Sequence, residues 1–328
     1  MKWILLFLLL VTSNLIAQNI MENYVFFNVE RYRISEKSFI ENDVFAGAQL
    51  KYTWPELEPE KGKYNFDLIQ KDLDFLELNG KGLFIQIQDV SFDTTIINVP
   101  RYIIEDPIYN GGIEIQFDLN DEETEYVVVE SLVARRWDKK VADRFHHLLK
   151  ALGNKFDGKI TGINLPETAV GFGNVDMHPL GYSHESYRNA IKENMRVLKE
   201  AFPNSIAIQY ANFMPGDKFP LGDDSYLESI YSYANEIEVG MGGPDVKVYK
   251  YWQMEHSMKF LKKYSDNVKA VAVQWGNYEE INPKTKRQVT IDEIYNFAVD
   301  EIGLNYIFWC TQEPYYTEYL IPYLKKVR

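Results

Sequence analysis

Eight short apolar runs alternate with longer segments of helical periodicity, and this alternation restricts the fold more than any other feature of the sequence. Strands that alternate with helices pair in parallel, because each helix carries the chain back to the start of the next strand. The pattern therefore predicts an α/β fold with eight strands, at Tyr24–Val29, Val44–Tyr52, Leu83–Gln88, Ile160–Asn164, Ser205–Tyr210, Ile237–Met241, Val268–Gln274 and Tyr306–Trp309.

The segments between these runs predict amphipathic helices. We expect helices at Asp67–Asn79, Lys139–Phe156, Glu185–Phe202, Tyr251–Tyr264, Ile291–Ile302 and Tyr316–Val327, with only Ser35–Ile40 available in the first unit. Eight such units make a (β/α)8 barrel (TIM barrel), for which ~250 residues is common. An open doubly wound sheet is the alternative, but no glycine-rich phosphate turn follows the first strand. We expect one barrel domain over residues 18–328.

The N-terminus has the layout of a secretory signal peptide. A short positive start precedes the apolar run Trp3–Val11, and a small residue, Ala17, follows at a suitable distance for cleavage. The run is shorter than the ~20 apolar residues that span a bilayer. We therefore expect residues 1–17 to be a signal peptide, the protein to be periplasmic or secreted, and the mature chain to have no membrane partner.

Charge and composition exclude several functions. The net charge of −13 argues against a nucleic-acid partner, because binding to phosphates needs local cationic density. Cys310 is the one cysteine in the sequence, so neither an intrachain disulfide nor a cysteine-based metal site is possible. The five histidines show no His-x-x-x-His spacing, and we expect no metal site. The sequence does not indicate an oligomeric state.

The connection between the third and fourth predicted strands, Asp89–Asp138, is exceptionally long and includes the acidic stretch Asp118–Glu125. Loops longer than ~15 residues in compact domains are usually functional or disordered. This one leaves the C-terminal end of a barrel strand, the face on which TIM-barrel active sites lie. We therefore expect a long loop after strand three that forms one wall of the site.

Amides, carboxylates and aromatic residues follow most of the predicted strands. Side chains at the C-terminal ends of barrel strands face bound ligands. Sugar hydroxyls both donate and accept hydrogen bonds, so amides and acids are suitable partners, and aromatic rings stack on sugar faces. The sequence therefore predicts a carbohydrate substrate, with Trp54, Gln88, Tyr210, Asn212, Gln274, Trp275, Asn277, Trp309 and Gln312 as substrate-binding residues.

The segment Trp54–Asp67, with the sequence WPELEPEKGKYNFD, resembles the segment after strand two in clan A glycoside hydrolases such as the barrel β-galactosidases and cellulases. The resemblance implies a barrel enzyme that acts on β-linked sugars with two carboxylates and no required cofactor. It places Glu167 at the strand-four acid. The sequence departs from the clan pattern at Pro166, which precedes Glu167, and at Gln274, which takes the position of the strand-seven nucleophile.

Glycoside hydrolysis needs two carboxyls, ~5–5.5 Å apart for retention and ~6.5–9.5 Å apart for inversion. Glu167 is the expected general acid. Asp245, on a Gly-Gly-Pro turn, is the first candidate for the second carboxyl, Glu313 is the next, and Glu279 is the third. A secreted glycoside hydrolase is the expected function, with inversion favoured if Asp245 is the base. The alternative is a non-catalytic carbohydrate-binding barrel, which Gln274 at the nucleophile position favours.

Overall fold

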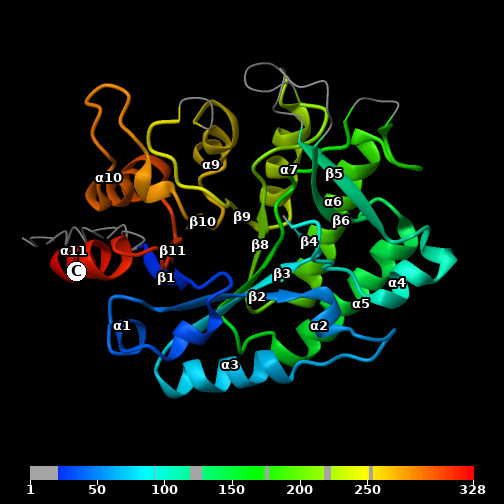
Figure 1. The fold of residues 1–328 in the computed structure, drawn as a ribbon, viewed down its shortest axis with the longest axis horizontal. Helices are drawn as coiled ribbons and strands as arrows, with labels where there is room; N and C mark the ends of the chain where they lie inside the picture. The colour runs from blue at the N-terminus through cyan, green and yellow to red at the C-terminus, as the bar shows by residue number, and fades with distance from the viewer. Residues whose placement is uncertain (1–20, 92, 119–127, 174–176, 218–222, 251–253) are drawn as a thin grey trace, which may run out of the picture.

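The computed structural model describes residues 21–328 except 92, 119–127, 174–176, 218–222 and 251–253, so the expected signal peptide lies outside the described residues. Eight parallel strands form a closed barrel in the order β1-β11-β10-β9-β8-β7-β3-β2 (Figure 1). The prediction of a (β/α)8 barrel is confirmed. The barrel strands are β1 (Glu22–Phe26), β2 (Gly47–Thr53), β3 (Gly82–Gln88), β7 (Gly162–Leu165), β8 (Ile206–Tyr210), β9 (Gly240–Gly243), β10 (Lys269–Val273) and β11 (Tyr306–Cys310).

Helices surround the barrel and bury their apolar faces against it (Figure 1). In α5, which spans Lys139–Phe156 as predicted, Asp138 caps the first turn and the buried side chains recur every three or four residues. The other longer helices are α3 (Asp67–Leu78), α6 (His184–Ala201) and α7 (Ser225–Glu236). The sequence analysis missed α7, whose alternating serines and tyrosines make a weak helical signal.

The shorter helices complete the units after β1, β9, β10 and β11. They are η1 (Arg31–Ser35), α1 (Lys37–Ile40), η4 (Met254–Met258), α9 (Lys259–Lys263), η5 (Asn277–Glu279), α10 (Ile291–Asn296), η6 (Phe297–Ile302), η7 (Tyr315–Leu320) and α11 (Ile321–Val327). Two of the predicted helices, at 291–302 and 316–327, are thus each divided into a π-helical turn and an α-helix. No helix among the described residues is long and apolar enough to cross a membrane.

The connection after β3 is not the plain loop that the sequence predicted. It contains β4 (Val90–Ser91), α4 (Arg101–Glu105), η2 (Pro107–Tyr109), β5 (Ile113–Asp118) and β6 (Val128–Ala134). Its strands form a small antiparallel sheet in the order β4-β6-β5, which lies beside the barrel (Figure 1). Backbone pairing between β5 and β6 satisfies the hydrogen-bonding groups that a long loop would leave to solvent. Most of the acidic stretch at 118–125 lies outside the described residues.

The segment Trp54–Asp67, which resembles clan A enzymes, packs the turn after β2 against α5. Trp54 begins the short helix α2 (Trp54–Leu57), is fully buried, and packs edge-on against Phe145 of α5. Its indole N–H donates to Glu58 Oε2 at 3.0 Å, while Glu58 Oε1 accepts from the Gly62 amide at 2.8 Å and from Arg144. The expectation that Trp54 binds substrate is therefore wrong, because its ring has no surface to offer a ligand.

The lower part of the barrel interior is filled by aromatic rings. Tyr24, Phe84 and Phe308 meet edge-on, with ring centroids 5.0–6.0 Å apart. Glycine at position 162 leaves room for them, because a Cβ there would lie 2.2 Å from Phe84 Cε1 and 2.7 Å from the Ile206 carbonyl oxygen. Close packing of the Phe84 ring thus requires glycine at position 162 on the neighbouring strand β7.

We expect Gly162→Ala to lower the free energy of unfolding by about 2–3 kcal/mol, because overpacking a filled core forces side chains and backbone apart. Urea denaturation followed by tryptophan fluorescence measures the change. The matched control is Gly243→Ala on β9, where an added Cβ meets nothing within 4 Å. Equal stability of the two variants would contradict this description of the interior.

Candidate active site

Glu167 lies in a turn that follows β7, and side chains from three other segments hold the backbone of this turn. Gln209 of β8 donates to the Pro166 carbonyl oxygen at 2.7 Å. Arg136 donates to the Glu167 carbonyl oxygen at 3.0 Å, and the Tyr187 hydroxyl donates to the Thr168 carbonyl oxygen at 3.0 Å. Three consecutive carbonyl groups are therefore fixed, so the position of the Glu167 side chain is set before any ligand arrives.

A buried ion pair supports this turn from behind. Arg136 precedes α5, and its guanidinium makes two hydrogen bonds to Asp89, of 2.8 and 2.6 Å, at the end of β3. Both side chains are buried, and Arg136 also donates to the Tyr187 hydroxyl at 2.8 Å. The sequence analysis did not identify Arg136, because an arginine before a helix has no distinctive motif.

The Glu167 carboxyl is suited to act as an acid. Its pKa is raised from the ordinary 4.5 to about 7, mainly by burial and to a smaller extent by the nearby negative charge of Asp245. A hydrogen bond from Asn212 Nδ2 to Glu167 Oε2, together with the charges of Lys51 and Arg136, acts in the opposite direction. The net effect keeps much of Glu167 protonated near neutral pH, as a general acid requires.

Asp245 is held in a similar way two strands further along the barrel. It follows β9, and its Oδ1 accepts a 2.7 Å hydrogen bond from Asn277 Nδ2. The Asn277 side chain is buried, and its oxygen accepts from the amides of Val246 and Gln274, both at 3.0 Å. Each acid is thus paired with an asparagine from the next strand of the barrel. The negative charge of Asp245 is close enough to Glu167 to raise its pKa.

Lys51 is a site residue that the sequence analysis missed. It lies on β2 in register with Gln86 of β3, and its ammonium is 5.2 Å from the centroid of the Phe26 ring. The ammonium forms no hydrogen bond or ion pair with any described residue, although the Lys51 carbonyl oxygen accepts from Arg31. Burial lowers its pKa to about 8, whereas the charge of Glu167 raises it. An ammonium without an oxygen partner near a buried carboxyl is suited to bind an oxygen of a ligand.

Polar side chains form a layer inside the barrel, closer than Lys51 to the N-terminal ends of the strands. Aliphatic residues are usual in such layers. Gln49 Nε2 donates to Asn164 Oδ1 and to the Tyr210 hydroxyl, both at 2.9 Å. The buried Oε1 atoms of Gln49 and Gln86 accept no hydrogen bond from any described residue. Tyr210, at 1% exposure, is part of this layer, and the expectation that its ring contacts a sugar is therefore wrong.

The predicted residues after β3, β10 and β11 have different roles. Trp275 is 58% exposed and remains a candidate sugar platform, and Gln274 and Gln88 lie at their predicted strand ends. Gln312, by contrast, accepts from the Gly276 amide at 2.8 Å and donates to Glu279 Oε1 at 2.7 Å. Gln312 thus supports the turn that carries Trp275.

The expectation that Trp309 binds sugar is wrong. The neighbouring Phe308 faces the barrel interior, and side chains alternate along a strand, so Trp309 faces the surrounding helices. It is fully buried, and its indole N–H donates to Asn23 Oδ1 at 2.8 Å. A large aromatic residue at a strand end therefore does not by itself indicate a binding platform.

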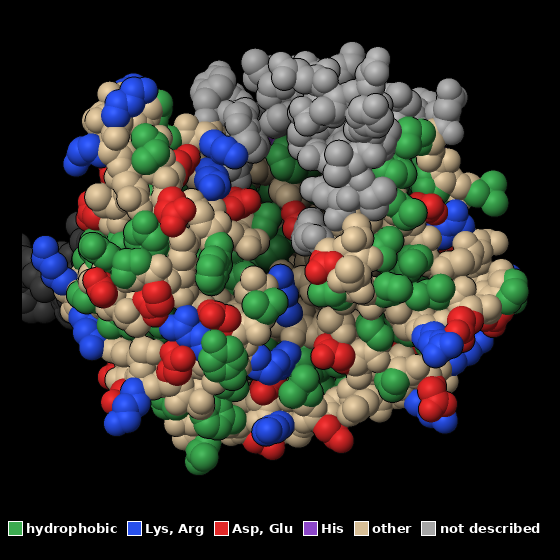
Figure 2. Space-filling model, viewed as in Figure 1, with side chains coloured by type: hydrophobic (Ala, Val, Ile, Leu, Met, Phe, Trp, Pro, Cys, Tyr) green, Lys and Arg blue, Asp and Glu red, His purple; other side chains and the backbone are tan. Residues whose placement is uncertain are grey.

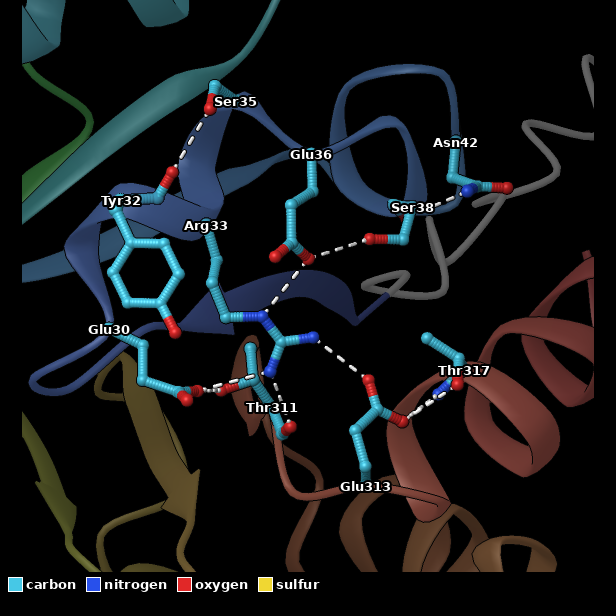
Figure 3. A network of polar contacts seen from close by, with 10 residues as sticks. All are labelled: Glu30, Tyr32, Arg33, Ser35, Glu36, Ser38, Asn42, Thr311, Glu313 and Thr317. Carbon is cyan, nitrogen blue, oxygen red and sulfur yellow. Dashed lines mark hydrogen bonds and ion pairs between the residues drawn. The ribbon is translucent and has the colours of Figure 1, made fainter.

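Glu313 belongs to a separate polar network that joins the segments after β1 and β11 (Figure 3). Its Oε1 accepts from Arg33 at 2.9 Å, and its Oε2 accepts from the hydroxyl of Thr317 at 2.7 Å. Arg33 also binds Glu30, Glu36 and the Thr311 carbonyl oxygen. Both oxygens of Glu313 are therefore engaged in holding the loops together. Glu279 is exposed and bound to Gln312.

The surrounding surface carries mixed charges. Figure 2 shows a hollow near the middle of one face, with acidic side chains at its border and charges of both signs spread over the rest of that face. No group of three or more His, Cys, Asp or Glu side chains that could hold a metal ion occurs among the residues that the structure describes.

Several solved structures share the fold. Xylanase 10B from Thermotoga petrophila RKU-1, solved in complex with xylobiose, aligns over 94% of both chains with a TM-score of 0.55 and 12% identity. The β-amylase catalytic domain from Paenibacillus polymyxa covers 89% of this chain and 92% of its own, with a TM-score of 0.58 and 6% identity. A β-galactosidase from Halorubrum lacusprofundi covers 88% of this chain and 52% of its own, with a TM-score of 0.55 and 10% identity.

No family model matches the sequence, and no curated protein matches it. At the low identities of these structural matches, the likeness concerns the fold alone. The resemblance to glycoside hydrolase barrels is confirmed at that level.

Proposed function

We propose that the protein is a glycoside hydrolase in which Glu167 is the general acid and Asp245 is its carboxylate partner. The observation that carries the proposal is a buried carboxyl with a raised pKa near a second carboxyl, each held by an asparagine amide. Glycosidic cleavage needs two carboxyls, one of which donates a proton to the leaving oxygen. The shared fold of a xylanase, a β-amylase and a β-galactosidase supports a carbohydrate substrate.

In the proposed reaction, Glu167 donates its proton to the glycosidic oxygen as the bond from the anomeric carbon to that oxygen breaks. Asp245 accepts a proton from a water molecule, whose oxygen forms the new bond to the anomeric carbon. Glu167 ends ionised and Asp245 protonated, and exchange with solvent restores both groups. This sequence inverts the anomeric configuration. The substitution of Gln for the strand-seven nucleophile at position 274 is consistent with a mechanism that needs no glycosyl ester.

Lys51 and the exposed Trp275 are the proposed sugar-binding groups. The Lys51 ammonium would donate hydrogen bonds to a hydroxyl of the sugar, and the Trp275 ring would stack on a sugar face. The signal-peptide pattern at residues 1–17 supports action in the periplasm or outside the cell.

The test of the function is release of reducing ends from a panel of oligosaccharides with β-xylosidic, β-glucosidic, β-galactosidic and α-glucosidic linkages. We expect hydrolysis of at least one linkage type. Binding to an oligosaccharide without any release over long incubation would instead favour the non-catalytic carbohydrate-binding barrel, the alternative that Gln274 suggests.

We expect Lys51→Met to move the alkaline limb of the pH profile of kcat upward by about 0.5–1 unit. The Lys51 charge lowers the pKa of Glu167, so its removal raises that pKa and keeps the acid protonated to higher pH. Lys51→Arg is the matched control, because it keeps the charge and should leave the limb in place. A limb that moves downward in Lys51→Met would show that Lys51 does not influence Glu167 in this way.

A further inference from the structure

A second concave site lies on the outer side of the segments that follow β10 and β11. It is a cavity of about 470 Å³, within the ~300–1,000 Å³ range of ligand pockets. We call it the tyrosine groove. Its lining includes Tyr278, Gln288, Asp292, Tyr315, Tyr319 and Tyr323. Its lining residues include members of α10 and α11, whose positions Figure 1 shows, but neither Glu167 nor Asp245.

Three of these rings form a stepped surface. Tyr278 and Tyr315 are stacked, with centroids 5.2 Å apart and an interplanar angle of 28°. Tyr319 follows at 6.1 Å from Tyr315 with an angle of 38°, and it is 54% exposed. Tyr278 is buried and supports the half-buried Tyr315, so Tyr319 is the exposed ring of the three. An exposed tyrosine ring offers an apolar face and a hydroxyl in the same side chain, which matches the surface of a sugar ring.

Hydrogen bonds hold the groove in shape. Gln288 Nε2 donates to the Tyr315 hydroxyl at 2.6 Å and to the Tyr278 carbonyl oxygen at 2.7 Å. The Tyr323 hydroxyl donates to Asp292 Oδ1 at 3.0 Å. Because these side chains are already fixed, a ligand loses little free energy in ordering them.

The chemistry of the lining selects a neutral ligand rich in hydroxyl groups. Asp292 is the charged residue among those that line the groove, and its carboxylate repels anions while it accepts hydrogen bonds from hydroxyls. The groove is also built on the same segments as the candidate active site, because Tyr278 directly follows Asn277, the residue that holds Asp245.

We propose that the tyrosine groove is a second carbohydrate-binding site, which takes a neutral oligosaccharide segment and keeps a polymeric substrate on the enzyme. This inference rests on the proposed function, since it assumes that the enzyme acts on sugar chains. Its occupant is a part of the chain that is not being cleaved.

The experiment is native affinity electrophoresis of the full chain in gels that contain arabinoxylan, mixed-linkage β-glucan or galactan. The Glu167→Gln background prevents digestion of the gel. We expect at least one polysaccharide to slow the migration of the Glu167→Gln parent protein. Adding Tyr319→Ala should weaken the apparent affinity for that polysaccharide about 5-fold or more, because one stacking ring is lost. Tyr319→Phe should keep most of the affinity. In the otherwise wild-type enzyme, Tyr319→Ala should leave turnover of a small aryl glycoside within about 2-fold.

Matched controls separate the outcomes. Leu78→Ala removes an exposed apolar side chain from the far helix α3 and should change nothing, and Gln288→Ala provides a second variant that loosens the groove without removing a ring. Three results would overturn the proposal. No polysaccharide retards the Glu167→Gln parent, both groove variants bind polysaccharide as tightly as that parent, or a proline-rich peptide binds the groove in place of a sugar chain. Hydrolysis of the aryl glycoside is measured in a separate assay, so failure of the proposed catalytic function would appear only in that assay.

Discussion

Glu167→Gln is expected to lower kcat on an unactivated oligosaccharide about 10³-fold or more, because the leaving sugar then departs without a proton. The fold should persist, since the turn that carries residue 167 is held through its backbone carbonyls rather than through the carboxyl. Sugar affinity should also persist. Initial rates of reducing-end release, with affinity measured by calorimetry, check both statements.

Two comparisons make this result specific to acid catalysis. A dinitrophenyl glycoside has a leaving group that needs little protonation, so Glu167→Gln should impair its cleavage far less than that of the oligosaccharide. Glu313→Gln is the matched carboxyl control, because Glu313 is bound to Arg33 and Thr317 outside the proposed pair. If Glu313→Gln abolished turnover while Glu167→Gln did not, the two assignments would have to be exchanged.

Asp245→Asn is expected to lower kcat about 10³-fold for every substrate, including the dinitrophenyl glycoside, because attack at the anomeric carbon would lack its base. The variant should fold, since asparagine can still accept the hydrogen bond from Asn277. Proton NMR of the first product formed by the wild-type enzyme gives the stereochemistry, and we expect inversion. Retention of configuration would instead make Asp245, or another carboxyl, a nucleophile.

The sequence predicted the barrel well because its strands are short apolar runs, and each of the eight expected strands appears within a few residues of its predicted limits. Glu167, Asp245, Asn212 and Asn277 were chosen from the sequence because each lies within a few residues of the end of a recognisable strand. The structure joins them by hydrogen bonds, and their roles in catalysis and binding stay predictions. The helix α7 was missed, since serine and tyrosine dilute its apolar stripe.

Two errors at the site have a common physical cause, which is the direction in which a side chain near a strand end faces. Trp309 and Trp54 were expected to bind sugar but are buried outside the barrel interior, because chain position alone does not say which face a side chain takes. Lys51 was missed because it lies within a strand rather than at its end. The alternation of polar residues at Gln49 and Lys51 between apolar neighbours was the signal that could have found it.

The most direct measurement of the central claim is an NMR titration of the Glu167 side-chain carboxyl, with selective ¹³C labelling, in the wild-type protein and in Asp245→Asn. The account predicts a midpoint near 7 in the wild type and a lower one in the variant, because the charge of Asp245 raises the pKa of Glu167. Below that midpoint Glu167 carries the proton it must donate. A midpoint near the ordinary 4.5, unchanged by the substitution, would leave Glu167 ionised at neutral pH and contradict its role as the acid.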